Sequence, residues 1–330
     1  MRNALEGARL FHFSRDALHL VYRALALPPG TPALLPSFHC GMEVRTALDA
    51  GFAPCFYGVH GDLTIDEDDL ARRLAEAPGP VLLIHYFGVP QPALARVAAR
   101  CRSLGVPLIE DASHAFLSEG AGLWGDATVW SLYKTCGTAD GGALRTRLDV
   151  PAPPGRAVAW AAQWDALRRR WRDAPRGRSR EALAAAFDDR AVSARRRIFE
   201  TTWTYGQGMS RLSLALIERL DPGAIAGRRR ENYDRLAALV SDRGLEPVVP
   251  ALPAGACPLY LPVLVKDRRE VLVRLQRAGV GTFVFGMFAH PAMDVAGFPE
   301  AAALRDDVLC LPIHHDLDAR DLGRVAELLG

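Results

Sequence analysis

Two residues with the chemistry of a covalent cofactor site, Asp111 and Lys134, lie 23 positions apart in the sequence. Only Lys134 and Lys266 are lysines among the 40 basic residues of the chain. Unlike arginine, a lysine can lose its proton and attack a carbonyl carbon as a neutral amine. Because a lone lysine is usually a solvated surface charge, the neighbouring residues decide how Lys134 is interpreted.

Asp111 directly follows Glu110 and a short apolar run at residues 106–109. Such a run predicts a buried parallel strand with the two acids at its C-terminal end. Downstream of Lys134, Asp140-Gly141-Gly142 predicts a turn before a second short apolar segment. Ligands of open α/β sheets bind outside the C-terminal ends of the strands. We therefore expect Asp111 and Lys134 to meet at one edge of a sheet.

A lysine and a carboxylate are the minimum that pyridoxal 5'-phosphate (PLP) requires. The lysine forms a Schiff base, and the carboxylate keeps the pyridine nitrogen protonated so that the ring withdraws electrons. Around these residues the sequence resembles the DegT/DnrJ/EryC1/StrS aminotransferases, often called sugar aminotransferases. The matching residues are Glu110-Asp111-Ala112-Ser113-His114-Ala115, Gly125-Asp126-Ala127, Ser131 with Lys134, and Asp140-Gly141-Gly142-Ala143.

The resemblance implies a role for each of four residues. Lys134 would bind PLP covalently and Asp111 would pair with the pyridinium nitrogen, and these two are the predicted catalytic residues. His114 would contact the phenolic oxygen of the cofactor, and Ser131 its phosphate. The distance from Lys134 to the double glycine fits the family, whereas that from Ser131 to Lys134 is shorter than usual.

A helix predicted to begin at Ser14 provides a second phosphate contact. Its apolar pattern continues to Leu25, with Ser14 as the N-cap. Helix N-termini bind phosphate through free N–H groups and the helix dipole. The family has a Gly-Ser/Thr pair here, and Ser14 and Arg15 replace it, so Arg15 would supply a cation instead of a hydroxyl. A plain helix cap is the alternative interpretation.

Two further strand ends are predicted near the cofactor. The segment 33–40 reads as a strand running into a loop, and it resembles the family segment that lays a ring over the cofactor. His39 or Cys40 stands where the family has its ring, and we predict His39 as a cofactor-binding residue, with a solvated loop histidine as the alternative. His85 and Tyr86 end the predicted strand 81–88, and they either border the crevice or belong to the core.

The chain is longer than one ordinary hydrophobic core, so two domains are expected. Alternating strands and helices predict a mostly parallel, doubly wound sheet. The resemblance implies the fold type I of PLP-dependent transferases, which is the aspartate-aminotransferase-like α/β fold. We predict a large PLP-binding domain at 1–240, with an arginine-rich helical insertion at about 156–202. The small α+β C-terminal domain is predicted at 241–330.

Three finer structural predictions accompany this division. A long helix is expected after residue 205, ending at Gly244, and a strand is expected over residues 281–285. In the insertion, tryptophans at helical spacing predict a face that packs on the body or on a partner subunit; they are Trp160, Trp164 and Trp171.

Composition limits the classes of partner. A hydrophobic fraction of 49% and a charged fraction of 24% are those of a soluble globular protein. A formal net charge of +2 gives no case for nucleic acid or an anionic membrane as a partner. The six cysteines show no metal-binding spacing, so we expect reduced thiols, a cytoplasmic protein and no metal. No apolar run has the length of a signal-peptide core at the start or of a membrane span.

The resemblance implies a PLP-dependent aminotransferase that moves an amino group, usually from glutamate, to a keto sugar linked to a nucleotide. One alternative is a PLP enzyme of the same fold with other chemistry or a non-sugar substrate. Another is a non-catalytic regulatory relative. Dehydratases of the family replace the lysine with histidine, so Lys134 argues against that branch.

A homodimer is expected as well. The segment 205–220 resembles the family segment whose asparagine reaches the cofactor of the neighbouring subunit, although Gly206 stands at that position here. An apolar helix face in the same segment needs cover, and a two-fold partner is the commonest source of it. We predict that residues 205–207 touch the site of the partner subunit.

Overall fold

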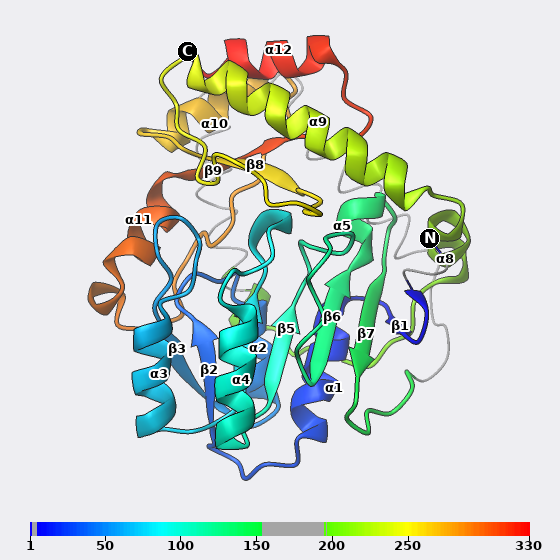
Figure 1. Cartoon of the computed structure of the whole chain (residues 1–330), viewed down its shortest axis with the longest axis vertical. Helices are drawn as coiled ribbons and strands as arrows, with labels where there is room; N and C mark the ends of the chain where they lie inside the picture. Colours follow the sequence, from blue (N-terminus) through cyan, green and yellow to red (C-terminus); the bar gives the residue numbers. More distant parts are fainter. Residues whose placement is uncertain (2–4, 154–194, 196) are drawn as a thin grey trace.

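The computed structural model describes residues 1, 5–153, 195 and 197–330. Its centre is a seven-stranded sheet with the strand order β1-β7-β6-β5-β4-β2-β3 (Figure 1). The strands are β1 Arg9–Phe11, β2 Pro32–Pro36, β3 Ala53–Tyr57, β4 Val81–Ile84, β5 Leu108–Asp111, β6 Ala127–Ser131 and β7 Gly142–Thr146. The five strands from β3 to β6 in this order pair in parallel, and β7 and β1 pair antiparallel. The predicted mostly parallel α/β sheet is confirmed.

Alternate residues of the central strands explain why helices cover both faces. Leu82 and Ile84 of β4 join the apolar cluster that contains α1 and α2. Val81 and Leu83 join the cluster that contains α3 and α4 on the opposite face. Side chains alternate along a strand, so a continuous apolar run requires cover on both sides. The helices are α1 Ser14–Ala24, α2 Met42–Asp49, α3 Glu67–Glu76 and α4 Leu94–Leu104.

A smaller layer lies beyond the C-terminal ends of the parallel strands (Figure 1). Its two strands, β8 Tyr260–Leu264 and β9 Val308–Pro312, pair antiparallel. They form a separate apolar cluster with the helices around them. The helices of this cluster are α9 Pro222–Ser241, α10 Arg268–Arg277 and α12 Ala319–Glu327. Helix α11 Pro299–Asp307 instead packs through Ala301 and Leu304 into the cluster that contains α1 and α2. Helix α9 packs into this second cluster through Tyr233, Leu236 and Val240. The domain boundary at 240/241 stays a prediction.

The structure corrects two predicted elements. The long helix after residue 205 is two helices, α8 Arg211–Glu218 and α9, because Asp221 caps a new helix whose first residue is Pro222. A proline is tolerated at the first position of a helix but not inside one. The strand predicted over 281–285 is not formed, and Phe283 makes only an isolated bridge to Cys310.

Most of the predicted insertion at about 156–202 lies outside the described residues, and so do its three tryptophans. Among the described residues, no helix combines the length and the apolar character needed to cross a bilayer.

Candidate active site

The C-terminal ends of β5 and β6 deliver the two predicted catalytic residues to one pocket. Asp111 is the last residue of β5 and pairs in register with Val129 of β6. Lys134 follows on a short helix, α5 Leu132–Cys136, that begins directly after β6. Both residues line the pocket, as expected for side chains at the ends of neighbouring parallel strands.

Asp111 is presented to the pocket by the turn that follows it. Its side chain is 6% exposed, and Oδ1 accepts a hydrogen bond from the backbone N–H of Ser113 at 2.9 Å. This bond directs one carboxylate oxygen to the protein and orients the group. The result is a buried, preoriented carboxyl group that lines the pocket.

The preceding acid, Glu110, points the other way and anchors the loop after β5. Its carboxylate accepts from the backbone N–H groups of Gly122 and Gly125, each at 2.6 Å, and of Trp124 at 2.9 Å. It also pairs with Nε2 of His85 at 2.9 Å. Burial alone would raise the pKa of Glu110, but the bonds from His85 and the backbone outweigh it, and the pKa is lowered. Glu110 is therefore an anion that holds the loop in place.

His85 and Tyr86 belong to the core and do not line this pocket. His85 is fully buried between Glu110 and the backbone N–H of Gln91, which donates to Nδ1 at 3.1 Å. Tyr86 is buried too, and its hydroxyl donates to the carbonyl of Phe38 at 2.5 Å. Of the two interpretations left open by the sequence, the core position is the correct one.

His114 lines the pocket with a defined tautomer. The backbone N–H of Phe87 donates to Nδ1 at 3.3 Å, so the proton of the neutral ring is on Nε2. Burial, and then the charge of Lys134, keep the pKa of His114 well below its usual range. The Phe87 ring stacks on it at 5.5 Å with an interplanar angle of 13°. His114 is thus a fixed neutral hydrogen-bond donor.

Three serine hydroxyls gather at the N-terminus of α1. Those of Ser14 and Ser131 are 2.7 Å apart, and the Ser113 hydroxyl donates to Ser14 at 3.2 Å. Ser14 is the first helical residue, and the N-cap is Phe13, so the predicted cap position was wrong by one residue. The free N–H groups of a helix start together with three hydroxyls are a set of donors for an anion.

Gly142 allows the close approach on which this cluster depends. A Cβ atom at Gly142 would lie 2.3 Å from the backbone carbon of Phe13 and 2.5 Å from the nitrogen of Ser14. Only a glycine on β7 therefore lets the start of α1 lie against the sheet beside Ser131. The double glycine in the sequence has a steric cause.

Arg15 also lines the pocket. Its guanidinium lies over the Phe13 ring at 4.1 Å and the Trp203 ring at 4.6 Å. Burial lowers the pKa of Arg15, although guanidinium remains charged at any ordinary pH. The two rings hold a cation beside the serine cluster, which fits the predicted phosphate contact.

His39 is not brought to the pocket. It is fully buried and stacks on Phe56 at 5.5 Å. Burial, and then the charges of Arg305 and His290, hold the pKa of His39 well below its usual range. Cys40, the other residue considered at this position, does line the pocket. The geometry gives no support to a cofactor contact by His39, because its ring is buried against Phe56.

Several residues that line the pocket were not singled out from the sequence as functional, among them Glu43, Ser113, Tyr133 and Phe285. Ser113 lies within the segment 110–115 that matches the family, and the predicted roles of its neighbours Asp111 and His114 were the signal that could have identified it. Glu43 was a lone acid near the start of a predicted helix, directly after the strand end at 33–40. Phe285 comes from the C-terminal part of the chain, so only the folded structure could place it here.

The donor set fits PLP. The aldehyde of PLP requires an amine, and its ring nitrogen requires a buried carboxylate. The phenolic oxygen requires a neutral N–H donor, and the phosphate requires an anion-binding helix start with a cation. All of them line one pocket. A bound PLP explains two features of this chain. One is the absence of a side chain at Gly142, and the other is the hydrogen on Nε2 of His114.

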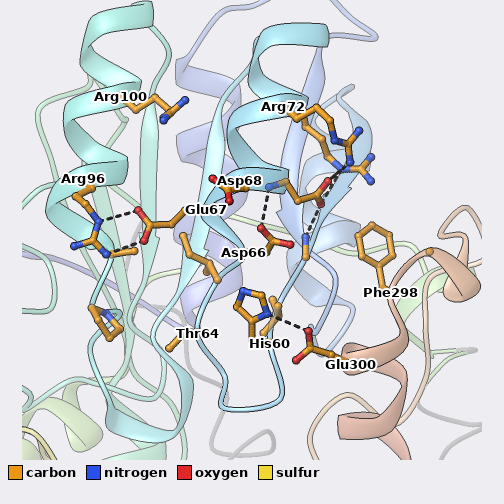
Figure 2. Close-up of a pocket in the computed structure, with 18 of the residues that line it drawn as sticks. His60, Thr64, Asp66, Glu67, Asp68, Arg72, Arg96, Arg100, Phe298 and Glu300 are labelled. Atoms are coloured by element: carbon orange, nitrogen blue, oxygen red, sulfur yellow. Dashed lines mark hydrogen bonds and ion pairs between the residues drawn. The ribbon is translucent and has the colours of Figure 1, made fainter.

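A more spacious groove lies elsewhere, between the starts of α3 and α4 and the helix α11 (Figure 2). Its acids and arginines pair with one another: Arg96 with Glu67 at 2.7 Å, and Arg72 with Asp69. The chemistry of the site is in the smaller pocket, because the lysine, Asp111 and the serine cluster are there.

Among the described residues, His314, His315 and Asp316 are the one group with potential metal-ligand atoms within 4.8 Å of one another, outside this pocket.

Comparison with known proteins agrees with this geometry. The model of the DegT/DnrJ/EryC1/StrS aminotransferase family matches residues 14–152. A dTDP-4-dehydro-2,3,6-trideoxy-D-glucose 4-aminotransferase from Saccharopolyspora spinosa is 28% identical over 94% of this chain and 80% of the relative. The crystal structure of the aminotransferase TlmJ from Streptoalloteichus hindustanus is 25% identical, with a TM-score of 0.69, over 99% of this chain and 87% of the other.

NtdA from Bacillus subtilis, solved with bound cofactor PMP, has the same fold. Its TM-score is 0.70 at 18% identity, over 98% of this chain and 72% of the other. Fold and site together define a PLP-dependent aminotransferase of fold type I. The family match confirms the resemblance to the DegT/DnrJ/EryC1/StrS aminotransferases that the sequence indicated.

Proposed function

We propose that this aminotransferase transfers an amino group from glutamate to a keto sugar that is linked to a nucleotide. The observation that carries the proposal is the single pocket that joins Lys134 and Asp111 to a phosphate-type anion site. The substrate class is supported by the relatives, which include aminotransferases named for dTDP-linked and UDP-linked keto sugars.

Lys134, Asp111 and His114, which line the pocket, each have a task in this reaction. When bound, PLP supplies an electron sink that makes the Cα–H of the amino donor acidic. Nζ of Lys134, as a neutral amine, removes that proton and returns it. Asp111 keeps the ring nitrogen protonated by offering a buried anion. The hydrogen on Nε2 of His114 orients the phenolic oxygen.

The anion-binding groups fix the position of the phosphate. The hydroxyls of Ser14, Ser113 and Ser131, which lie together at the start of α1, would donate to it with the first N–H groups of this helix. The Arg15 guanidinium, which lies over the Phe13 ring, would balance its charge. A phosphate held in this way would keep the cofactor in the pocket that Lys134 and Asp111 line.

The test uses the purified protein with PLP. Glutamate should convert the absorbance of the lysine-bound cofactor into that of PMP. Borohydride reduction before glutamate is added should fix the cofactor to the peptide that contains Lys134. Lys134→Ala should abolish both signals, and Lys266→Ala, the matched control, should leave them unchanged. A label on Lys266, or no response to glutamate, would contradict the proposal.

We also propose a homodimer in the cytoplasm, acting on small molecules and not on nucleic acid or membranes. Two exposed leucines on α8 support a partner, since Leu212 is 44% and Leu216 46% exposed. Residues 205–207 do not line the pocket of their own chain, so a partner's pocket is available to them. The two-domain division at 240/241 is part of the same proposal.

A further inference from the structure

Glu43 is a buried acid in the active-site pocket that the proposed reaction has not used. It is the second residue of α2, and its side chain lines the pocket with Asp111 and Lys134. Only 5% of it is exposed. Among the described residues no ion pair to Glu43 is formed, and its side-chain partner is the Cys40 thiol, which donates to Oε2 at 3.2 Å.

The surroundings of Glu43 raise the pKa of its carboxyl. Burial, and then the negative charge of Asp111, raise the pKa of Glu43 to about 7, while Lys134 and the Cys40 bond act in the opposite direction. An acid near the operating pH is the type that transfers protons effectively. The titratable and charged groups that interact with it are Tyr22 on α1, Cys40 before α2, Tyr86 after β4, Asp111 on β5 and Lys134 on α5. The pocket is also lined by Arg15, His114 and Tyr133.

Lys134 needs such a partner. As an ammonium ion it can neither attack an aldehyde nor remove a proton, so its proton must leave before the lysine acts. Asp111 is already committed to the ring nitrogen, and His114 has its Nδ1 bonded to Phe87. Glu43 is the acid of the pocket that remains.

We propose that Glu43 is the proton-exchange partner of Lys134. Across the pocket that both side chains line, its carboxylate takes up the proton that Nζ releases, which leaves a neutral amine and a neutral carboxylic acid. The reverse transfer restores the ammonium and the carboxylate. Cys40 positions the carboxyl by donating to Oε2 and remains a thiol, because burial raises the pKa of the thiol well above its usual range. This inference rests on the proposed function, because it concerns the same lysine.

The first experiment follows the apoprotein by infrared difference spectroscopy during a pH titration. The wild type should show a protonated carboxyl that ionises near pH 7. Glu43→Gln should lose this signal, and Glu76→Gln, which changes an exposed acid on α3, should keep it. A wild type without such a signal, or a signal that survives in Glu43→Gln, would overturn the proposal even if the glutamate reaction is absent.

The second experiment measures the single-turnover rate with glutamate against pH. In the wild type the rate should rise with pH through about 7, because the carboxylate is the form that accepts the proton. Glu43→Gln should lose this rise and react on the order of 10²-fold more slowly, which is typical for loss of an acid–base group. Glu43→Asp should keep the rise at a reduced rate.

Two measurements distinguish proton exchange by Glu43 from a purely structural role. Borohydride labelling should still fix PLP to Lys134 in Glu43→Gln, and its thermal unfolding should resemble that of the wild type. A pH profile that is unchanged in a folded, PLP-binding Glu43→Gln would refute proton exchange. A wild type that does not react with glutamate would instead refute the proposed function, while the infrared titration still decides the role of Glu43.

Discussion

Consecutive acids at the end of β5 have opposite tasks. Side chains alternate along a strand, so Glu110 and Asp111 leave it on opposite sides. Glu110 meets three backbone N–H groups and His85, and it secures the loop that carries Ser113 and His114. Asp111 meets the pocket. One acid therefore supports the site, and the other takes part in its chemistry.

Asp111→Ala should leave PLP weakly bound and lower the transamination rate by at least about a hundredfold, because no anion then keeps the ring nitrogen protonated. Asp234→Ala, an exposed acid on α9, is the matched control and should behave as the wild type. Cofactor absorbance and stopped-flow rates with glutamate measure both effects. Near-normal turnover in Asp111→Ala would remove Asp111 from its assigned role.

At the scale of elements, a contact between the two layers ties the loop after β3 to α11. Glu300 of α11 accepts from the backbone N–H of Gly61 at 2.6 Å and bonds Nδ1 of His60 at 3.0 Å (Figure 2). The bond with Glu300 is the main cause that raises the pKa of His60, and the bond with His60 is the main cause that lowers the pKa of Glu300. Both groups are largely exposed, so solvent weakens the tie.

The pH dependence of this tie has a definite sign. The pKa of His60 is raised on folding. The stability that protonated His60 contributes is therefore complete below its unfolded pKa of about 6.5, and it is lost as pH rises through its folded pKa. Hydrogen exchange of residues 58–66, corrected for the intrinsic rate, should therefore accelerate above that range. Glu300→Gln should exchange faster at all pH values and lose the dependence. Glu327→Gln, an acid on α12, is the control, and a pH dependence that persists in Glu300→Gln would contradict the assignment.

At the scale of the whole molecule, subunit mixing tests the proposed dimer. A chain with Lys134→Ala and a chain with Gln207→Ala should each be impaired alone. Mixed after mild unfolding and refolding, they should regain activity, because one site of each heterodimer then has a wild-type lysine and a wild-type partner segment. Tyr205 is a poor choice for substitution, since its hydroxyl donates to Asp49 of the same chain at 2.7 Å.

Light scattering provides the independent measurement. The expected mass is twice the 35.9 kDa of the chain. The substitution Leu212→Asp with Leu216→Asp on α8 should shift the mass toward a single chain, whereas Leu123→Asp, another exposed leucine, should not. A single-chain mass for the wild type at working concentration would rule the dimer out.

Much of the large sheet and part of the site could be predicted from the sequence. The segment 106–109 with its terminal acids indicated β5, and the position of Lys134 after Asp111 indicated a shared sheet edge. Both signals are local, because strand periodicity and the position of a residue at a strand end depend on a few neighbours. The double glycine was also recognisable, although its steric reason, the approach of Phe13 to Gly142, was not.

The rest was decided by tertiary structure. His39 and Glu43 are four residues apart, and packing turned His39 into the core against Phe56 while Glu43 entered the pocket. Phe285 reached the pocket across more than 150 residues of sequence from Lys134. Such outcomes depend on which distant groups desolvate a side chain and which charges lie beside it. Those quantities are properties of the folded chain, so the sequence by itself determined the sheet edge and its lysine, and the fold decided what surrounds them.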